Sequence, residues 1–107
     1  MANQLAHVSI GIAGILGPEA AARIAATAEA AGFYGLWVNE IVGADALGML
    51  AAAAEATTTL QLATGVIPVD RRPGSNIAAQ VTSLGLPADR LMIGIGSGKP
   101  GVGSLGR

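Results

Sequence analysis

The chain has 107 residues, about half of them apolar, and a formal net charge of −1. The near-neutral charge argues against nucleic acid or an anionic membrane as the main partner, and the absence of cysteine excludes disulfides and thiolate chemistry. Because His7 is the single histidine, we expect no metal site. Neither a signal peptide nor a membrane-length apolar run is visible, so we expect a cytoplasmic protein.

Short apolar runs alternate with longer helical stretches from the start of the chain. Residues 7–13 predict a first strand, with alternate apolar side chains on one face. Pro18 at a first helical position, followed by an acidic residue, predicts the start of a helix, and Gly32 predicts its end. Residues 34–39 predict a second strand, in which Trp37 faces away from its apolar neighbours.

The same alternation continues to the end of the chain. A second helix is predicted over 43–57 and a third strand over 60–66. A third helix is predicted to begin at Pro73 and to end at Gly85, and a fourth strand is predicted over 91–96. The apolar stripe of the third helix predicts that three side chains face inward: Ile77, Val81 and Leu84. The glycine-rich stretch from Ser97 onward predicts a loop.

The element order βαβαβαβ predicts an α/β fold with four parallel strands joined by helical crossovers. Two architectures fit this order: an open doubly wound sheet and part of a (β/α)₈ barrel of the TIM type. A complete barrel takes about 250 residues, so a barrel reading makes 1–107 a single half-barrel domain. Its outer strands would be unpaired edges, and a second half would have to come from a longer chain or from another copy of this one.

In both architectures, ligands bind at the carboxyl ends of the strands. Four segments lie at that end of the predicted sheet: 13–17, 39–43, 65–72 and 96–101. The opposite end carries His7, two threonines and the pair Asp89-Arg90.

Two arginines, Arg71 and Arg72, precede the third helix, where the helix dipole disfavours cations. We therefore expect a compensating negative group, which could be Asp70, Glu40 or a ligand. Glu40 itself is interpreted either as a solvated loop acid or partner of these arginines, or as a polar group that faces a cofactor. Gly65, inside the third strand, predicts a bend or a close approach of the backbone, or else a packing glycine beneath a helix.

The glycine-rich segment 94–101 allows three interpretations. Its glycines match the spacing G-x-G-x-x-G of dinucleotide-binding turns, but Pro100 and the residues after it do not open an obvious helix. A flexible loop is the simplest alternative. The third interpretation is a close backbone approach to a flat cofactor or its phosphate, assisted by Ser97 and Lys99.

Three segments, taken together in order and spacing, resemble the luciferase-like monooxygenase superfamily. The segment 32–40 (Gly-Phe-Tyr-Gly-Leu-Trp-Val-Asn-Glu) resembles the second-strand signature. The segment 64–80 (Thr-Gly-Val-Ile-Pro to Ile-Ala-Ala-Gln, with Arg-Arg-Pro between) resembles the third strand and helix. The segment 84–98 (Leu-Gly-Leu-Pro to Gly-Ile-Gly-Ser-Gly) resembles the fourth strand.

The resemblance implies the N-terminal half of an FMN- or coenzyme F-420-dependent (β/α)₈-barrel oxidoreductase or monooxygenase. Its members transfer a hydride between cofactor and a small-molecule substrate, or use reduced flavin with O₂. The resemblance also implies a non-prolyl cis peptide at Gly65-Val66 beneath the cofactor ring. By the same resemblance, Glu40 is the catalytic candidate, and the cofactor-binding candidates are Asn39, Gly65, Val66, Gly96 and Ser97.

The sequence departs from the family at one position of the expected site. Many relatives have a histidine after the acid that ends the second strand, but this chain has Ile41. His7 is expected at the opposite end of the sheet, so we expect no histidine-assisted proton transfer. Two alternatives stay open: a non-catalytic half-barrel that forms homo-oligomers through its exposed edges, and an open flavodoxin-like or Rossmann-like nucleotide-binding domain.

Overall fold

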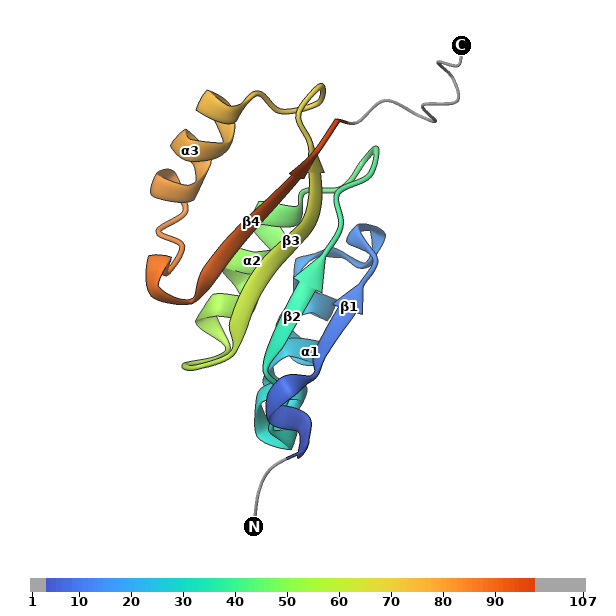
Figure 1. The fold of residues 1–107 in the computed structure, drawn as a ribbon, viewed down its shortest axis with the longest axis vertical. Helices are drawn as coiled ribbons and strands as arrows, with labels where there is room; N and C mark the ends of the chain where they lie inside the picture. The colour runs from blue at the N-terminus through green and yellow to red at the C-terminus, as the bar shows by residue number, and fades with distance from the viewer. Residues whose placement is uncertain (1–3, 98–107) are drawn as a thin grey trace.

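The structure, a computed structural model, describes residues 4–97 and contains one sheet of four parallel strands. The strands are β1 (Ser9–Ile12), β2 (Gly35–Val38), β3 (Gln61–Pro68) and β4 (Leu91–Gly96). They are connected by α1 (Gly17–Ala31), α2 (Ala46–Glu55) and α3 (Gly74–Ser83), with short 3₁₀ helices η1 (Gln4–His7), η2 (Gly14–Leu16) and η3 (Ala88–Arg90). Figure 1 shows α1 and α2 behind the sheet and α3 beyond β4.

The strands are ordered β1-β2-β3-β4, the same as their order in the chain. A doubly wound sheet reverses its strand order at a switch point, and the described sheet has no such reversal. The open flavodoxin-like or Rossmann-like alternative is therefore wrong for residues 4–97, and the predicted βαβαβαβ order of parallel strands is confirmed.

The core lies between the sheet and the first two helices. Helix α1 contributes only small side chains, Ala21, Ala25 and Ala28, which are at most 1% exposed and let the helix approach closely. Larger side chains from α2 and from the strands fill the remaining space, and the largest of these are fully buried: Leu36, Val38, Leu47, Met49, Leu50, Leu60, Leu62 and Ile67. Small residues on one helix and leucines on the next explain how a chain with three aromatic residues still packs densely.

The other face of the sheet carries Trp37, as the alternation of β2 predicts. The register places Gly11 and Ala63 on either side of Trp37, and Met92 beyond Ala63. We call these four residues the inner face. Trp37 is 39% exposed and Met92 is 62% exposed, so the inner face presents apolar side chains that have little cover in this chain.

Two sequence expectations about local packing are wrong. His7 belongs to η1 and not to the first strand, because the Val8 N–H donates to Leu5 O and the chain enters β1 through a tight turn. In α3, Ile77 is buried as expected, but Leu84 is 41% exposed. Leu84 caps a helix that ends at Ser83, and Gly85, at φ +65°, then turns the chain away.

Within residues 4–97, no helix is long and apolar enough to cross a bilayer.

At the amino ends of the strands, charged side chains hold the connecting turns. Arg90 donates to Thr57 Oγ1 and to the carbonyl oxygens of Ala54, Thr57 and Leu60, at 2.8 to 3.1 Å. Glu29 accepts hydrogen bonds at 2.6 to 3.2 Å from the N–H groups of Thr58, Thr59 and Leu60 and from the Thr59 hydroxyl. These contacts give Arg90 a structural role at this end, at the position where the sequence placed it.

The same hydrogen bonds lower the pKa of Glu29. The Thr59 N–H has the largest effect, burial partly opposes it, and the N–H groups of Thr58 and Leu60 and the Thr59 hydroxyl lower the pKa further, to about 2 from an ordinary value of 4.5. A carboxyl group whose pKa is lower in the folded state stabilises the fold above its unfolded pKa and loses that effect as the group is protonated. The stabilisation by Glu29 is therefore lost as the pH falls from about 4.5 towards 2.

We predict that Glu29→Gln lowers the free energy of unfolding at pH 7 by about 1 to 2 kcal/mol, because charge-assisted hydrogen bonds become neutral ones at a partly solvated site. The measurement is urea unfolding at fixed chain concentration, followed by Trp37 fluorescence. The difference from the unchanged chain should shrink as the pH falls from 4.5 towards 2. Glu55→Gln, at an exposed position of α2, is the control; a difference for Glu29→Gln that stays constant with pH contradicts the prediction.

Candidate functional site

The carboxyl ends of the strands meet at one edge of the sheet, and hydrogen bonds join neighbouring segments there. The Asn39 side-chain Oδ1 accepts from Gly14 N–H at 2.7 Å, which fixes the loop after β1 against the end of β2. The Val69 N–H donates to Gly96 O at 3.0 Å, which joins the loop after β3 to the end of β4. The predicted gathering of four segments is confirmed for their described residues.

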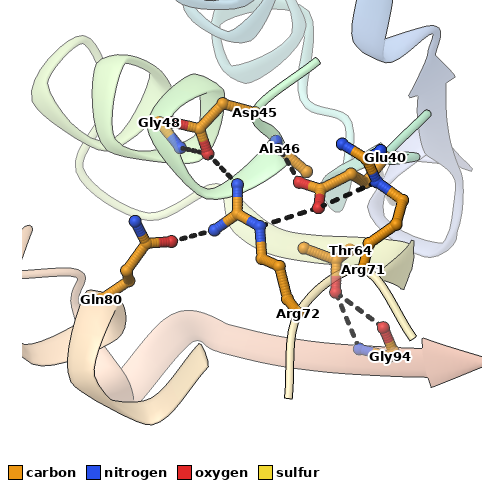
Figure 2. A network of polar contacts seen from close by, with 9 residues as sticks. All are labelled: Glu40, Asp45, Ala46, Gly48, Thr64, Arg71, Arg72, Gln80 and Gly94. Atoms are coloured by element: carbon orange, nitrogen blue, oxygen red, sulfur yellow. Dashed lines mark hydrogen bonds and ion pairs between the residues drawn. The ribbon is translucent and has the colours of Figure 1, made fainter. Parts of the chain in front are cut away.

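Glu40 lies immediately after β2, and its side chain is completely buried. Its Oε1 accepts from the Ala46 N–H at 3.0 Å, at the first residue of α2. Its Oε2 accepts from Arg72 Nε at 2.7 Å and lies 3.9 Å from Arg71 Nε (Figure 2). The expected pairing with the arginines is confirmed, whereas the expectation of a solvated acid is wrong, because both oxygens have partners inside the protein.

Asp45 is a second carboxylate at the start of α2. It is the N-cap residue, and its Oδ1 accepts from Gly48 N–H at 3.1 Å and from Arg72 Nη2 at 2.5 Å. Burial tends to raise the pKa of Asp45, but the Gly48 N–H and the Arg72 guanidinium outweigh it and lower the pKa below its usual value. Asp45 lies within the range 43–57 predicted for the second helix, but its contact with Arg72, 27 residues away, was not predicted.

Arg72 joins three elements through one guanidinium group. It donates to Glu40 after β2, to Asp45 at α2 and to the Gln80 side chain on α3 (Figure 2). Burial tends to lower the pKa of Arg72, but the hydrogen bonds and charges of Asp45 and Glu40 raise it above its usual value. Glu40 and Asp45 thus offset the unfavourable position of a cation before α3. Glu40 was one of the expected compensating groups, and Asp45 was not.

The peptide Gly65-Val66 is cis, at the position that the family resemblance implies. The Val66 carbonyl accepts from the Glu40 N–H at 3.1 Å, and the Val66 side chain is 42% exposed. A Cβ at Gly65 would lie 2.7 Å from Trp37 Cε3. Gly65 is therefore required by the close approach of an indole ring on the inner face, and the interpretation as a packing glycine beneath a helix is wrong.

Two glycines of β4 complete the surface around Val66. A Cβ at Gly96 would lie 2.9 Å from Val66 Cγ2, and a Cβ at Gly94 would lie 2.5 Å from Thr64 O. The Thr64 hydroxyl exchanges hydrogen bonds with the N–H and the carbonyl of Gly94, at 2.9 and 3.0 Å (Figure 2). This bracing by Thr64 was not predicted, since a threonine inside a strand carries no distinctive signal.

We call Trp37, Gly65, Val66 and Gly96 the platform. It combines the partly exposed apolar side chains of Trp37 and Val66 with the two glycines, at the carboxyl ends of β2, β3 and β4. Ser97 follows β4 directly and is exposed. The other residues expected from the glycine-rich loop, including Lys99, lie outside the described residues.

Ile41 and His7 lie at opposite ends of the sheet, as the sequence predicts. Ile41 follows Glu40 at the carboxyl end and is 40% exposed, so an apolar side chain occupies the position directly after the acid. His7 is in η1, before β1, at the opposite end of the sheet. The chain therefore offers no histidine near the platform within residues 4–97.

Comparisons with known proteins agree with this geometry. The family model described as luciferase-like monooxygenase matches residues 4–104. Among solved structures, the chain is similar to the coenzyme F420-dependent tetrahydromethanopterin reductase from Methanopyrus kandleri, with a TM-score of 0.72 and 24% sequence identity. That similarity establishes the fold: the four parallel strands correspond to part of a TIM-barrel protein.

The match covers 92% of this chain and 29% of the reductase, so this chain spans less than a third of the length of that protein. The comparison with curated proteins finds no match. The family model covers nearly all of the chain, including the three segments that the sequence singled out. The chain belongs to the luciferase-like monooxygenase family.

Proposed function

We propose that the chain carries the ring-binding part of an FMN- or coenzyme F420-dependent oxidoreductase. The observation that carries the proposal is the platform at the strand ends, where Val66 is exposed and its carbonyl is held by the Glu40 N–H. Ligands of TIM-type folds bind at this end of the sheet. Membership of the luciferase-like monooxygenase family supports this choice of cofactor class.

The residues present fit a flat conjugated ring. Binding sites for such rings are largely apolar, with a few polar groups that fix orientation. Val66 and Trp37 offer apolar surface, while Gly65 and Gly96 keep side chains away from the backbone between them. Bound here, the cofactor would supply or accept a hydride, and the platform would orient its ring and exclude water from one face.

We assign Glu40 a positioning role in this site. Its N–H fixes the Val66 carbonyl, and its carboxylate is already bonded to Ala46 N–H and to Arg72. To carry a proton to or from a substrate, Glu40 would have to give up one of these bonds inside the protein. The geometry thus favours Glu40 as the residue that holds Val66, over the direct catalytic role expected from the family resemblance.

Arg71 is the cation that we expect to attract the phosphate of the cofactor. Its side chain is 36% exposed, and its Nε lies 3.9 Å from the Glu40 carboxylate, a longer contact than that of Arg72. Glu40 is more closely bonded to Arg72, so the Arg71 guanidinium has capacity for an anion. Phosphate groups are a preferred partner of arginine, because the planar guanidinium can bind two oxygens at once.

We predict that the chain binds FMN or coenzyme F420 in titrations followed by quenching of Trp37 fluorescence. Gly65→Ala should weaken binding at least about tenfold, because the new methyl group displaces the indole ring from the platform. Gly74→Ala is the matched control, since a Cβ there meets no atom within 4 Å. Absence of quenching by both cofactors, or equal affinity of the two variants, would contradict the assigned platform.

We further predict that Arg71→Met weakens binding of FMN by about five- to tenfold, a loss of about 1 kcal/mol. Riboflavin, which has the same ring without the phosphate, should bind the two chains equally. The measurement is the ratio of dissociation constants for the two ligands in each chain. A parallel loss of riboflavin binding would show that Arg71 supports the ring site and does not contact the phosphate.

A further inference from the structure

Asn39 follows β2 directly, and β2 has a paired strand on each side. Successive residues of a strand point to opposite faces of its sheet. Val38 is buried in the core beside the helices, and the Glu40 carboxylate contacts the start of α2, so these two residues face the helices. Trp37 lies on the other face, and Asn39, two positions further along, belongs to the same face as Trp37. The Asn39 side chain is therefore on the side of the sheet that carries the platform.

The orientation of the Asn39 amide is fixed by a backbone group. Gly14 is buried, and its N–H donates to the Asn39 Oδ1 at 2.7 Å. The atom that faces an N–H donor must be the amide oxygen, because the amide nitrogen donates and does not accept. The NH₂ group of Asn39 thus keeps two N–H donors, and neither has a partner among residues 4–97.

The contact with Gly14 uses only the oxygen of this side chain, and the oxygen of aspartate could accept the same hydrogen bond. The amide nitrogen is therefore a capacity that the fold does not use. Its neighbours on the platform, Trp37 and Val66, offer apolar surface that is 39% and 42% exposed. A polar group beside an apolar surface is the usual way in which a binding site fixes the orientation of a flat ligand.

The chemistry of the donor indicates which part of a ligand it would meet. An uncharged amide N–H suits a neutral carbonyl oxygen, whereas phosphate oxygens bind more strongly to a guanidinium. The exposed guanidinium of this end, Arg71, comes from the loop after β3 and not from β2. The platform thus has a neutral donor at the end of β2 and a cation beyond β3.

We propose that the Asn39 Nδ2 donates a hydrogen bond to a carbonyl oxygen at the edge of the cofactor ring. This inference rests on the proposed function, and it adds which edge of the ring lies toward the end of β2. The rings of FMN and of coenzyme F420 both have carbonyl groups at one edge, so the contact serves either cofactor. Asn39 is then a binding residue that selects rings with a carbonyl acceptor, and Gly14 holds its amide in the required orientation.

The test is Asn39→Asp at pH 7, with riboflavin as the ligand and quenching of Trp37 fluorescence as the measurement. Aspartate keeps an oxygen for the Gly14 N–H but replaces the two donors with a second oxygen, which repels a carbonyl. Riboflavin has the carbonyl edge without the phosphate, so repulsion between the new charge and a phosphate does not contribute. We expect the dissociation constant to rise at least about fivefold, as for the loss of one hydrogen bond.

Two further variants separate binding from charge and from folding. Val42→Asp adds the same charge in the same loop, at a position that is 81% exposed, and should bind riboflavin as the unchanged chain does. Asn39→Leu leaves the buried Gly14 N–H without its acceptor, so it should lower the urea midpoint of unfolding. Asn39→Asp should leave that midpoint unchanged.

Each other outcome overturns a stated part of this account. If the unchanged chain binds riboflavin and Asn39→Asp binds it as tightly or more tightly, Asn39 serves only Gly14 and the proposed function stands without this inference. An equal loss of binding in Val42→Asp would assign the effect to charge, and a lowered urea midpoint for Asn39→Asp would overturn the orientation of the amide. Absence of quenching in the unchanged chain would overturn the proposed function itself.

Discussion

The contact between the buried Glu40 carboxylate and the Arg72 guanidinium organises the carboxyl end of the sheet. A carboxylate with no exposed surface costs several kcal/mol unless charge and hydrogen bonds compensate it. Arg72 supplies the charge at 2.7 Å, and the first N–H of α2 supplies a hydrogen bond at 3.0 Å. Because the backbone of the same glutamate holds the Val66 carbonyl, the position of the platform depends on this buried pair.

The same guanidinium adds a polar connection between α2 and α3, which also contribute side chains to one hydrophobic core. It bonds to Asp45 at the start of α2 and to Gln80 on α3, the helix with a single buried residue. The amino ends of the strands are held differently, by Glu29 and Arg90 against backbone groups of the turns. The fold thus separates its two ends: charged side chains secure the turns at one end, and the other end carries the platform, at the carboxyl ends of the strands where TIM-type folds bind ligands.

Much of the fold could be predicted from the sequence, because strands and helices differ in their apolar period. Such local patterns predict three features correctly: the range 91–96 of β4, the αL cap at Gly32 and the orientation of Trp37. The outward position of Leu84 could not be predicted in this way, because its spacing continues the buried stripe although the helix ends one residue earlier, at Ser83.

The site was predictable only in part, for a similar reason. Glycine at position 65 signalled a close approach, but the partner, Trp37, comes from another strand and is fixed by the sheet register. The expectation of a negative group near Arg72 included Glu40 among three candidates, because a cation before a helix N-terminus requires a compensating charge. It did not identify Asp45 as a second partner, since that contact depends on how the loop after β2 folds back over the strand end.

A double-mutant cycle on the buried pair tests this account most directly. Glu40→Gln, Arg72→Met and the double variant are compared by their free energies of unfolding in urea, at one chain concentration. The account predicts that each single variant loses about 3 kcal/mol, because the remaining partner is left unpaired, and that the double variant loses little more than either one, a coupling of about 2 kcal/mol or more. If the two single-variant losses sum to the loss of the double variant within about 0.5 kcal/mol, the result would contradict the central role of the Glu40–Arg72 contact.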